Sequence, residues 1–219
     1  MKISKFFYDL WILFNGHGWV KLAKEVAYCI KYAIIYFQPS VANKLQEIAE
    51  ETFKEHSTVD KVTVSLYKEP GYGYGETIDD RRTLWWEAPL TVTVWINGYP
   101  AFGMAVEFNS KFVCIRQLQG VRGAQVPKDL HKWPQIFVEV CKKLVSEIGW
   151  RGVRIYRADQ NRFYKKPFLT WGFAIEKKEY EAIVKKHKPR MRRRYDGTAR
   201  QLGFDMKKRY GVWTNPDYA

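Results

Sequence analysis

One acidic residue stands inside an otherwise apolar stretch of this sequence. Glu107 lies between Val106 and Phe108, near the end of the strand predicted for residues 99–108. Burial raises the pKa of a carboxyl group toward the range where it exchanges protons near neutral pH. Glu107 is therefore a candidate general base. The alternative is a carboxylate at a sheet edge that faces solvent.

The densest group of charges lies near the end of the chain. Residues 185–194 are Lys-Lys-His-Lys-Pro-Arg-Met-Arg-Arg-Arg, so seven of the ten are Lys or Arg. Arginine suits phosphate because its planar fork donates two hydrogen bonds at once. The cations expected to contact nucleic acid are Lys188, Arg190, Arg192, Arg193 and Arg194.

Aromatic residues alternate with cations around this segment. Such a mixture can stack bases and hold phosphates, or it can be a solvated face with core aromatics beneath it. No groove-reading motif is evident, so any nucleic-acid binding is expected to depend on shape and charge. The aromatic residues concerned are Phe163, Tyr164, Tyr195, Tyr210 and Trp213.

The excess positive charge is concentrated in one part of the chain. The formal net charge is +14, and residues 150–219 carry 19 basic and 7 acidic side chains, a net of +12. A field this local favours an anionic ligand, whether nucleic acid, a phosphorylated cofactor or an anionic membrane surface. A surface that serves only solubility is the alternative.

The cysteines and histidines suggest neither disulfides nor a metal site. The three cysteines, Cys29, Cys114 and Cys141, are far apart, and the four histidines are scattered. This pattern fits a reducing compartment, and we expect a cytoplasmic protein without a structural metal.

No stretch approaches the roughly 20 apolar residues of a bilayer span. Residues 3–37 can lie on a membrane or a partner, or pack as two helices on their own domain.

Hydrophobic periodicity predicts an α+β fold in which a mixed, mainly antiparallel sheet is flanked by helices. A helical N-terminal extension (1–38, with helices at 4–14 and 19–37) precedes one domain (39–219). Asn97-Gly98 marks a hairpin, and Pro134 and Gly149 suit the two ends of a helix at 133–148. The other predicted helices begin near Pro39 and cover 177–187 and 194–202. The strands are predicted at 61–68, 90–96, 99–108, 112–118 and 152–158, with one or two more in the tail.

The segment before the central helix contains a partial glycine motif. Gln117, Gly120 and the residues around them resemble the GNAT superfamily of N-acyltransferases, whose pattern is Gln or Arg, two residues, Gly, one residue, then Gly or Ala. Here Arg122 occupies the last position and Gly123 follows one residue late. In that superfamily the loop's N–H groups hold the pyrophosphate of coenzyme A, as turns of consecutive N–H groups attract anions. The alternative is an ordinary strand-to-helix turn. The resemblance implies cofactor contacts from Gln119, Gly120, Val121, Arg122, Gly123 and Ala124.

Further positions extend the resemblance. Asn161 follows the strand 152–158, where the superfamily often has Asn, and Leu202-Gly203-Phe204 is similar to its closing Gly-Phe. A Tyr that often serves as general acid is replaced by Ala199, and Tyr195 lies one turn earlier. The resemblance thus implies catalytic roles for Glu107 and Tyr195. Leu118-Gln119-Gly120 and Tyr195-Asp196 also resemble the bacterial VirK/YbjX family, which suggests a bacterial origin.

Two functions follow as hypotheses. The first is an N-acyltransferase that uses acetyl-CoA or another acyl-CoA, with Glu107 as base. The second is a non-catalytic protein that binds nucleic acid through residues 185–210. An acyltransferase-like enzyme that modifies nucleic acid or its charged adapters would combine the two.

Overall fold

The computed structural model divides the chain into two compact units, Met1–Pro39 and Ser40–Ala219. The helices predicted at 4–14 and 19–37 lie outside the described residues, and so does any contact that they make. The structure describes residues 39–59, 61–67, 77–79, 82–83, 88, 90–109, 111–121, 123–161, 164, 176–207 and 211–215.

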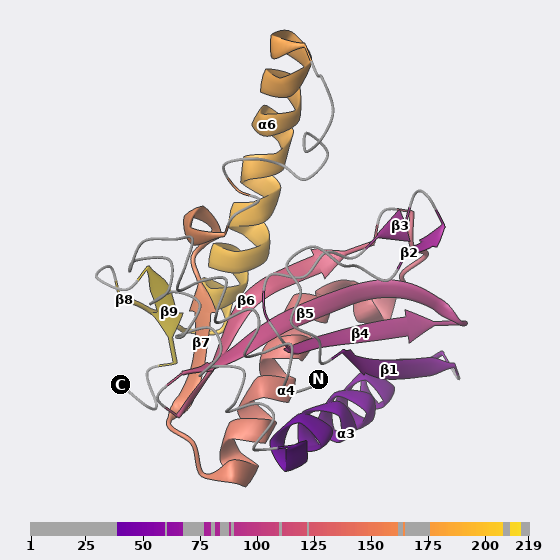
Figure 1. The fold of residues 1–219 in the computed structure, drawn as a ribbon, viewed down its shortest axis with the longest axis vertical. Helices are drawn as coiled ribbons and strands as arrows, with labels where there is room; N and C mark the ends of the chain where they lie inside the picture. Colours follow the sequence, from indigo (N-terminus) through magenta and orange to yellow (C-terminus); the bar gives the residue numbers. More distant parts are fainter. Residues whose placement is uncertain are drawn as a thin grey trace, which may run out of the picture. The chain divides into compact units, whose positions relative to one another are not determined.

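The second unit is built on a seven-stranded sheet (Figure 1). Its strand order is β1-β4-β5-β6-β7-β9-β8, and every neighbouring pair is antiparallel except β6 and β7. The predicted α+β class with a mainly antiparallel sheet is therefore confirmed. Two short strands, β2 (Thr77–Asp79) and β3 (Arg82–Thr83), pair separately. The strands of the main sheet are β1 (Val62–Tyr67), β4 (Leu90–Ile96), β5 (Tyr99–Asn109), β6 (Phe112–Gly120), β7 (Gly152–Tyr156), β8 (Asp205–Lys207) and β9 (Val212–Thr214).

The central strands form the predicted meander. Asn97 and Gly98 both have positive φ, 53° and 80°, as the two-residue hairpin between β4 and β5 requires. β5 then pairs antiparallel with β6, with a register shift between Ala105 and Val106. This irregularity lies beside the residues that form the candidate site.

Two helices cover one face of the sheet. In α3 (Pro39–Glu55) the predicted apolar positions Val41, Leu45, Ile48, Ala49 and Phe53 are all buried. Phe53 packs against Phe102 of β5 and Phe137 of α4 (Trp133–Ile148), with ring centroids 5.5 and 4.9 Å away. The core therefore lies between α3, α4 and the even-numbered side chains of β5.

The crossover through α4 makes β6 and β7 parallel, as predicted. Phe112 to Ile115 pair in register with Gly152 to Ile155. A 3₁₀ turn, η1 (Lys128–Lys132), precedes α4, and Pro134 lies in the first turn of the helix. Gly149 ends α4 in the left-handed conformation with φ 65°, the predicted cap.

The last third departs from the prediction in one respect. The two helices expected at 177–187 and 194–202 form one continuous helical run. It comprises α6 (Lys177–Arg192), a π turn η4 (Arg193–Gly197) and α7 (Thr198–Gln201). Pro189, which lacks an N–H and falls between the two predicted helices, lies inside α6. Met191 and Tyr195 are both buried four residues apart, so packing of this side outweighs the local cost of the proline.

Candidate functional site

The parallel strands β6 and β7 separate partway along their length. Their pairing ends at Ile115 and Ile155, whereas β6 continues to Gly120. Beyond Ile115, β7 no longer pairs with β6. Buried N–H and C=O groups need partners, so side chains or other groups must satisfy them there. This part of β6, residues 116–120, is the centre of the candidate site.

The Tyr195 hydroxyl forms hydrogen bonds to this part of β6. The backbone N–H of Leu118 donates to the Tyr195 hydroxyl at 2.8 Å, and the hydroxyl lies 3.4 Å from the Leu118 carbonyl oxygen. Asn161 Nδ2 donates to the same hydroxyl at 3.0 Å and to the Arg116 carbonyl at 3.3 Å. Tyr195 is 1 % exposed and comes from the π turn η4. Two residues predicted from the sequence, Tyr195 and Asn161, therefore meet here.

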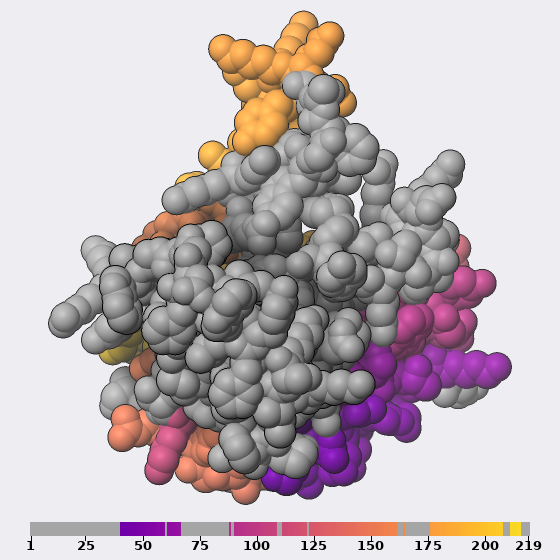
Figure 2. Space-filling view, in the orientation of Figure 1, coloured from indigo at the N-terminus to yellow at the C-terminus, as the bar shows by residue number. Residues whose placement is uncertain are grey.

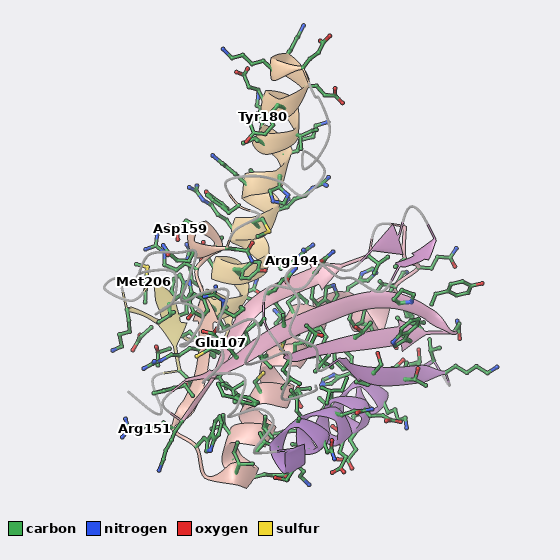
Figure 3. The ribbon with its side chains drawn as sticks, viewed as in Figure 1. Glu107, Arg151, Asp159, Tyr180, Arg194 and Met206 are labelled. Carbon is green, nitrogen blue, oxygen red and sulfur yellow. The ribbon has the colours of Figure 1, made fainter. Side chains whose placement is uncertain are left out.

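Arg194 extends the same contacts toward the end of β6 (Figure 3). Its Nη1 donates to the Leu118 carbonyl at 3.2 Å, and its guanidinium lies 5.3 Å from the Trp133 ring centre. Burial lowers the pKa of Arg194; Tyr195 acts in the opposite direction and the charge of Arg190 in the same one. Within the described residues Arg194 forms no ion pair with a carboxylate. A desolvated cation without an acidic partner favours an anion beside it.

Gly120 borders this cation. A Cβ built on Gly120 would lie 3.6 Å from Trp133 Cζ2 and 4.0 Å from Arg194 Nη2. An alanine therefore fits, whereas a larger side chain fills the space between the indole and the guanidinium. We call Gly120, Trp133 and Arg194 the Arg194 site. It joins a residue predicted to bind cofactor with one predicted to bind nucleic acid.

The rest of the predicted phosphate segment has other surroundings. The Gln119 side chain accepts from Gln117 Nε2 at 2.9 Å, and the Val121 N–H donates to the Ala101 carbonyl at 2.8 Å. The Ala124 N–H donates to the Val121 carbonyl at 3.3 Å, and Arg122 lies outside the described residues. The turn η1 separates this segment from α4, so residues 119–124 do not form the N-terminus of that helix.

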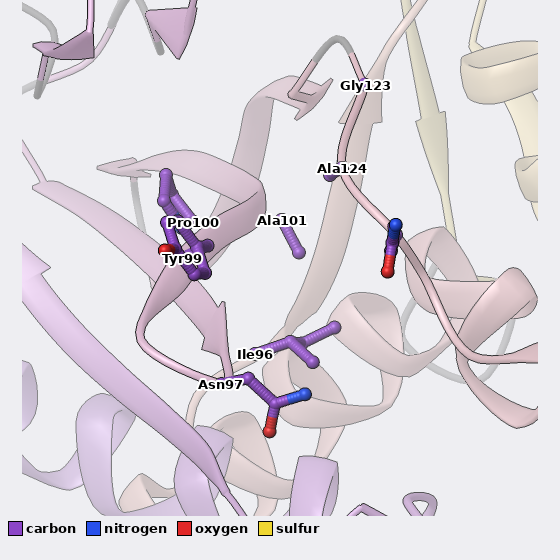
Figure 4. A pocket seen from close by; sticks show the side chains of 8 residues that line it. Ile96, Asn97, Tyr99, Pro100, Ala101, Gly123 and Ala124 are labelled. Atoms are coloured by element: carbon purple, nitrogen blue, oxygen red, sulfur yellow. The ribbon is translucent and has the colours of Figure 1, made fainter.

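A cavity of about 400 Å³ opens beside the same loop (Figure 4). It lies between the β4–β5 hairpin and the loop after β6. Its described lining carries no charged side chain, so this part of the cavity offers no cation to a phosphate. The residues around it are Ile96, Asn97, Tyr99, Pro100, Ala101, Gly123, Ala124 and Gln125.

Glu107 belongs to a second polar group, on the face of the sheet opposite α4. Its carboxylate accepts a hydrogen bond from the Tyr156 hydroxyl at 2.8 Å and lies 3.9 Å from Arg116 Nε. The Arg116 guanidinium also lies over the Tyr156 ring at 4.1 Å. Glu107 is 7 % exposed, so the alternative of a carboxylate that faces solvent is wrong. We call Glu107, Arg116 and Tyr156 the Glu107 cluster.

Burial fixes the protonation state of the phenol in this cluster. Desolvation, and next the negative charge of Glu107, raise the pKa of Tyr156 to about 12. Tyr156 is therefore a neutral donor at physiological pH, and it holds one carboxylate oxygen of Glu107 in place. Sequence reasoning missed Tyr156 and Arg116. The order of β5, β6 and β7 was predicted, but no register was, and it is the observed register that aligns Glu107 with Cys114 and Arg154, two residues before Tyr156.

Unsatisfied polar atoms lie along the same row of the sheet. Glu107, Cys114, Arg154 and Thr214 occupy matching positions on β5, β6, β7 and β9. Arg154 Nε and Thr214 Oγ1 are buried and have no hydrogen-bond partner among the described residues. The Arg154 guanidinium lies over the Phe112 ring, 3.6 Å from its centroid, and Thr214 is three strands away from Glu107, so neither atom marks a ligand beside the carboxylate.

The two groups lie at opposite ends of one stretch of β6. Glu107 is paired with Cys114, and Gly120 is six residues further along the strand. At about 3.3 Å per residue the Cα atoms of Cys114 and Gly120 are up to roughly 20 Å apart. The side chains come closer than that, because Arg194 contacts Leu118 and Glu107 lies 3.9 Å from Arg116 Nε. A ligand that contacts both groups must extend along β6 and carry its anionic group apart from its reactive group.

The predicted basic segment lies mainly on α6. Lys188 and Arg192 lie over the Tyr164 ring, with cation-to-centroid distances of 5.5 and 5.7 Å, whereas Arg190 and Arg193 are exposed. The described aromatic residues of this region, Tyr164, Tyr195 and Trp213, are 7 %, 1 % and 7 % exposed. They are core residues, so for these three the alternative of core aromatics beneath a solvated face holds. Phe163 and Tyr210 lie outside the described residues.

The described part of the chain has neither a metal-binding cluster nor a bilayer-spanning helix. It holds no group of three or more His, Cys, Asp or Glu side chains arranged to bind a metal ion. None of its helices combines the length and apolar character that crossing a bilayer demands.

Comparison with known proteins gives no relative. No family model matches the chain, and neither a curated protein nor a solved structure matches it.

Proposed function

We propose that the chain is an N-acyltransferase that takes its acyl group from coenzyme A or a similar long-armed thioester. The observation that carries this proposal is that the Arg194 site and the Glu107 cluster both contact β6 beyond the end of its pairing with β7. A phosphate-bearing thioester has an anion at one end and its reactive carbonyl at the other.

In this proposal the Arg194 site holds a phosphate of the donor. Arg194 supplies a desolvated guanidinium, and Gly120 allows close approach of the phosphate to the backbone. The amides of the donor arm replace Tyr195 at the N–H and carbonyl of Leu118, as an extended peptide does at an open strand edge. Tyr195 thus satisfies the Leu118 backbone when no donor is bound, and we assign it this role in place of the general-acid role that the resemblance implies.

Glu107 acts as the base. It accepts a proton from the acceptor amine, whose nitrogen attacks the thioester carbonyl carbon. The C–N bond forms, the C–S bond breaks, and the thiolate leaves with a proton that Glu107 can return. Tyr156 is a positioning residue, because a phenol with a pKa of about 12 is a poor acid for a thiolate.

Thiol release from acetyl-CoA in the presence of an amine panel tests this proposal. General base catalysis contributes about 10²–10⁴ in rate. Glu107→Gln should therefore lower the rate at least a hundredfold without lowering donor affinity. Glu139→Gln, an exposed acid on α4 that pairs with His56, is the matched control and should leave the rate unchanged. A Glu107→Gln protein as fast as the wild type, or no amine-dependent thiol release, contradicts the proposal.

A further inference from the structure

The exposed side of α6 carries a row of cations. Its residues follow helical spacing, so they share one side of the helix. The opposite side, with Tyr180, Val184, His187 and Met191, is buried or half-buried. Figure 2 shows side chains from the start of α6 standing at the surface. The row, which we call the cationic face of α6, consists of Lys178, Lys185, Lys186, Arg190 and Arg193 from the adjoining π turn, all exposed.

The charges of this face are not neutralised within the described part of the protein. None of its five cations forms an ion pair there, and neither do Glu179 and Glu181 in the first turns. Some lysines elsewhere form ion pairs: Lys44 pairs with Glu147 and Lys143 with Glu55, both at 2.8 Å. Lys61, Lys132 and Arg151 form none among the described residues. The feature particular to α6 is that five such cations follow one side of a single helix.

The side chains of this face suit a nucleic-acid duplex better than an anionic membrane or a single strand. An anionic membrane binds helices that also insert bulky apolar side chains, and the exposed side of α6 has only Ala182 and Pro189 between its charged residues. Single-stranded nucleic acid needs aromatic platforms, and among the described aromatic residues of this region Tyr164, Tyr195 and Trp213 are buried and Tyr180 is half-buried. The backbone of a duplex needs only cations at repeated spacing.

We propose that the cationic face of α6 binds the phosphate backbone of a nucleic-acid duplex without reading its sequence. From Lys178 to Arg193 the row extends about 22 Å at 1.5 Å per residue. A duplex presents one phosphate charge per about 1.7 Å of its axis, so all five cations can reach a phosphate. This binding is separate from acyl transfer and does not depend on it.

Fluorescence anisotropy of a labelled 20-base-pair duplex, RNA or DNA, tests the proposal on the full chain. Five neutralised phosphates predict a slope of log affinity against log salt of about −4.5. The variant Lys185→Gln/Lys186→Gln/Arg190→Gln removes three of them, so the slope should shrink by about 2.7. The side chains are exposed, and glutamine is a good helix former, so the melting temperature should stay the same.

A matched triple variant separates this face from general charge. Lys61→Gln/Lys132→Gln/Arg151→Gln changes the net charge equally at exposed cations away from α6. It should alter the slope by less than about 1. Three results would overturn the proposal: equal loss of affinity in the two triple variants, no duplex binding at low salt, or binding only to phosphatidylserine vesicles or polyglutamate. A scrambled duplex of equal length should bind equally well, and a strong sequence preference would also overturn it.

Discussion

Replacing Tyr195 with phenylalanine removes the hydroxyl that closes the edge of β6. The ring stays, so the core loses little packing, but the Leu118 N–H loses its partner at 2.8 Å. The Leu118 carbonyl keeps Arg194, and Asn161 Nδ2 keeps the Arg116 carbonyl. One buried donor is therefore left unsatisfied, which costs about 1–3 kcal/mol. For a unit of this size, 2 kcal/mol lowers the melting temperature by about 4–8 °C.

The same variant should bind coenzyme A more tightly, since the donor no longer displaces the hydroxyl. Thermal unfolding followed by circular dichroism measures the first effect, and calorimetric titration measures the second. Tyr164→Phe is the control, because Tyr164 is equally enclosed but its contacts with Lys188 and Arg192 use the ring alone. If Tyr195→Phe has the same melting temperature as the wild type, the hydrogen bond from the Leu118 N–H to the hydroxyl does not stabilise the fold. If its affinity for coenzyme A falls, Tyr195 belongs to the donor site instead of closing it.

Three further predictions concern stability and binding. The pKa of Tyr156 is raised, so the folded state holds the phenol proton more tightly than the unfolded chain. The free energy of unfolding should therefore fall between about pH 10 and 12, by at most about 1.4 kcal/mol per pH unit, and not below pH 10. Denaturant unfolding should show this fall in the wild type and not in Tyr156→Phe. Gly211→Ala should destabilise the protein more than Gly123→Ala. Both glycines have positive φ, but only at Gly211 would a Cβ meet Gln160, at 2.7 Å; equal melting temperatures would contradict this. Arg194→Gln should weaken binding of coenzyme A about 10–100-fold in calorimetric titration, as loss of a charged hydrogen bond does, and unchanged affinity would contradict the Arg194 site.

The parts of the fold set by local chemistry were predictable from the sequence. Asn97-Gly98 requires the positive φ of a tight hairpin, and Pro134 and Gly149 suit only the first turn and the end of α4. The central meander and the parallel β7 follow from these elements because a strand that returns through a helix runs parallel to the first.

The site was less predictable because its contacts join distant parts of the chain. Tyr195 reaches Leu118 because α6 continues through Pro189, whereas the sequence predicted separate helices at 177–187 and 194–202. Tyr156 reaches Glu107 across two strand pairings and the register shift near Ala105. The charge of residues 185–194 was evident, but only the structure separates Arg194, which faces Gly120, from the exposed cations of α6.

The central claim is that a long-armed thioester binds along β6 with its phosphate at the Arg194 site. Calorimetric titration of coenzyme A into the wild type, Gly120→Ala and Gly120→Val tests it most directly. The alanine fits beside Trp133, so that variant should fold and bind nearly as well as the wild type. The valine should fold but lose at least tenfold in affinity, because its side chain occupies the space of the phosphate. Equal affinity in all three proteins, or no heat of binding to the wild type, would contradict the claim.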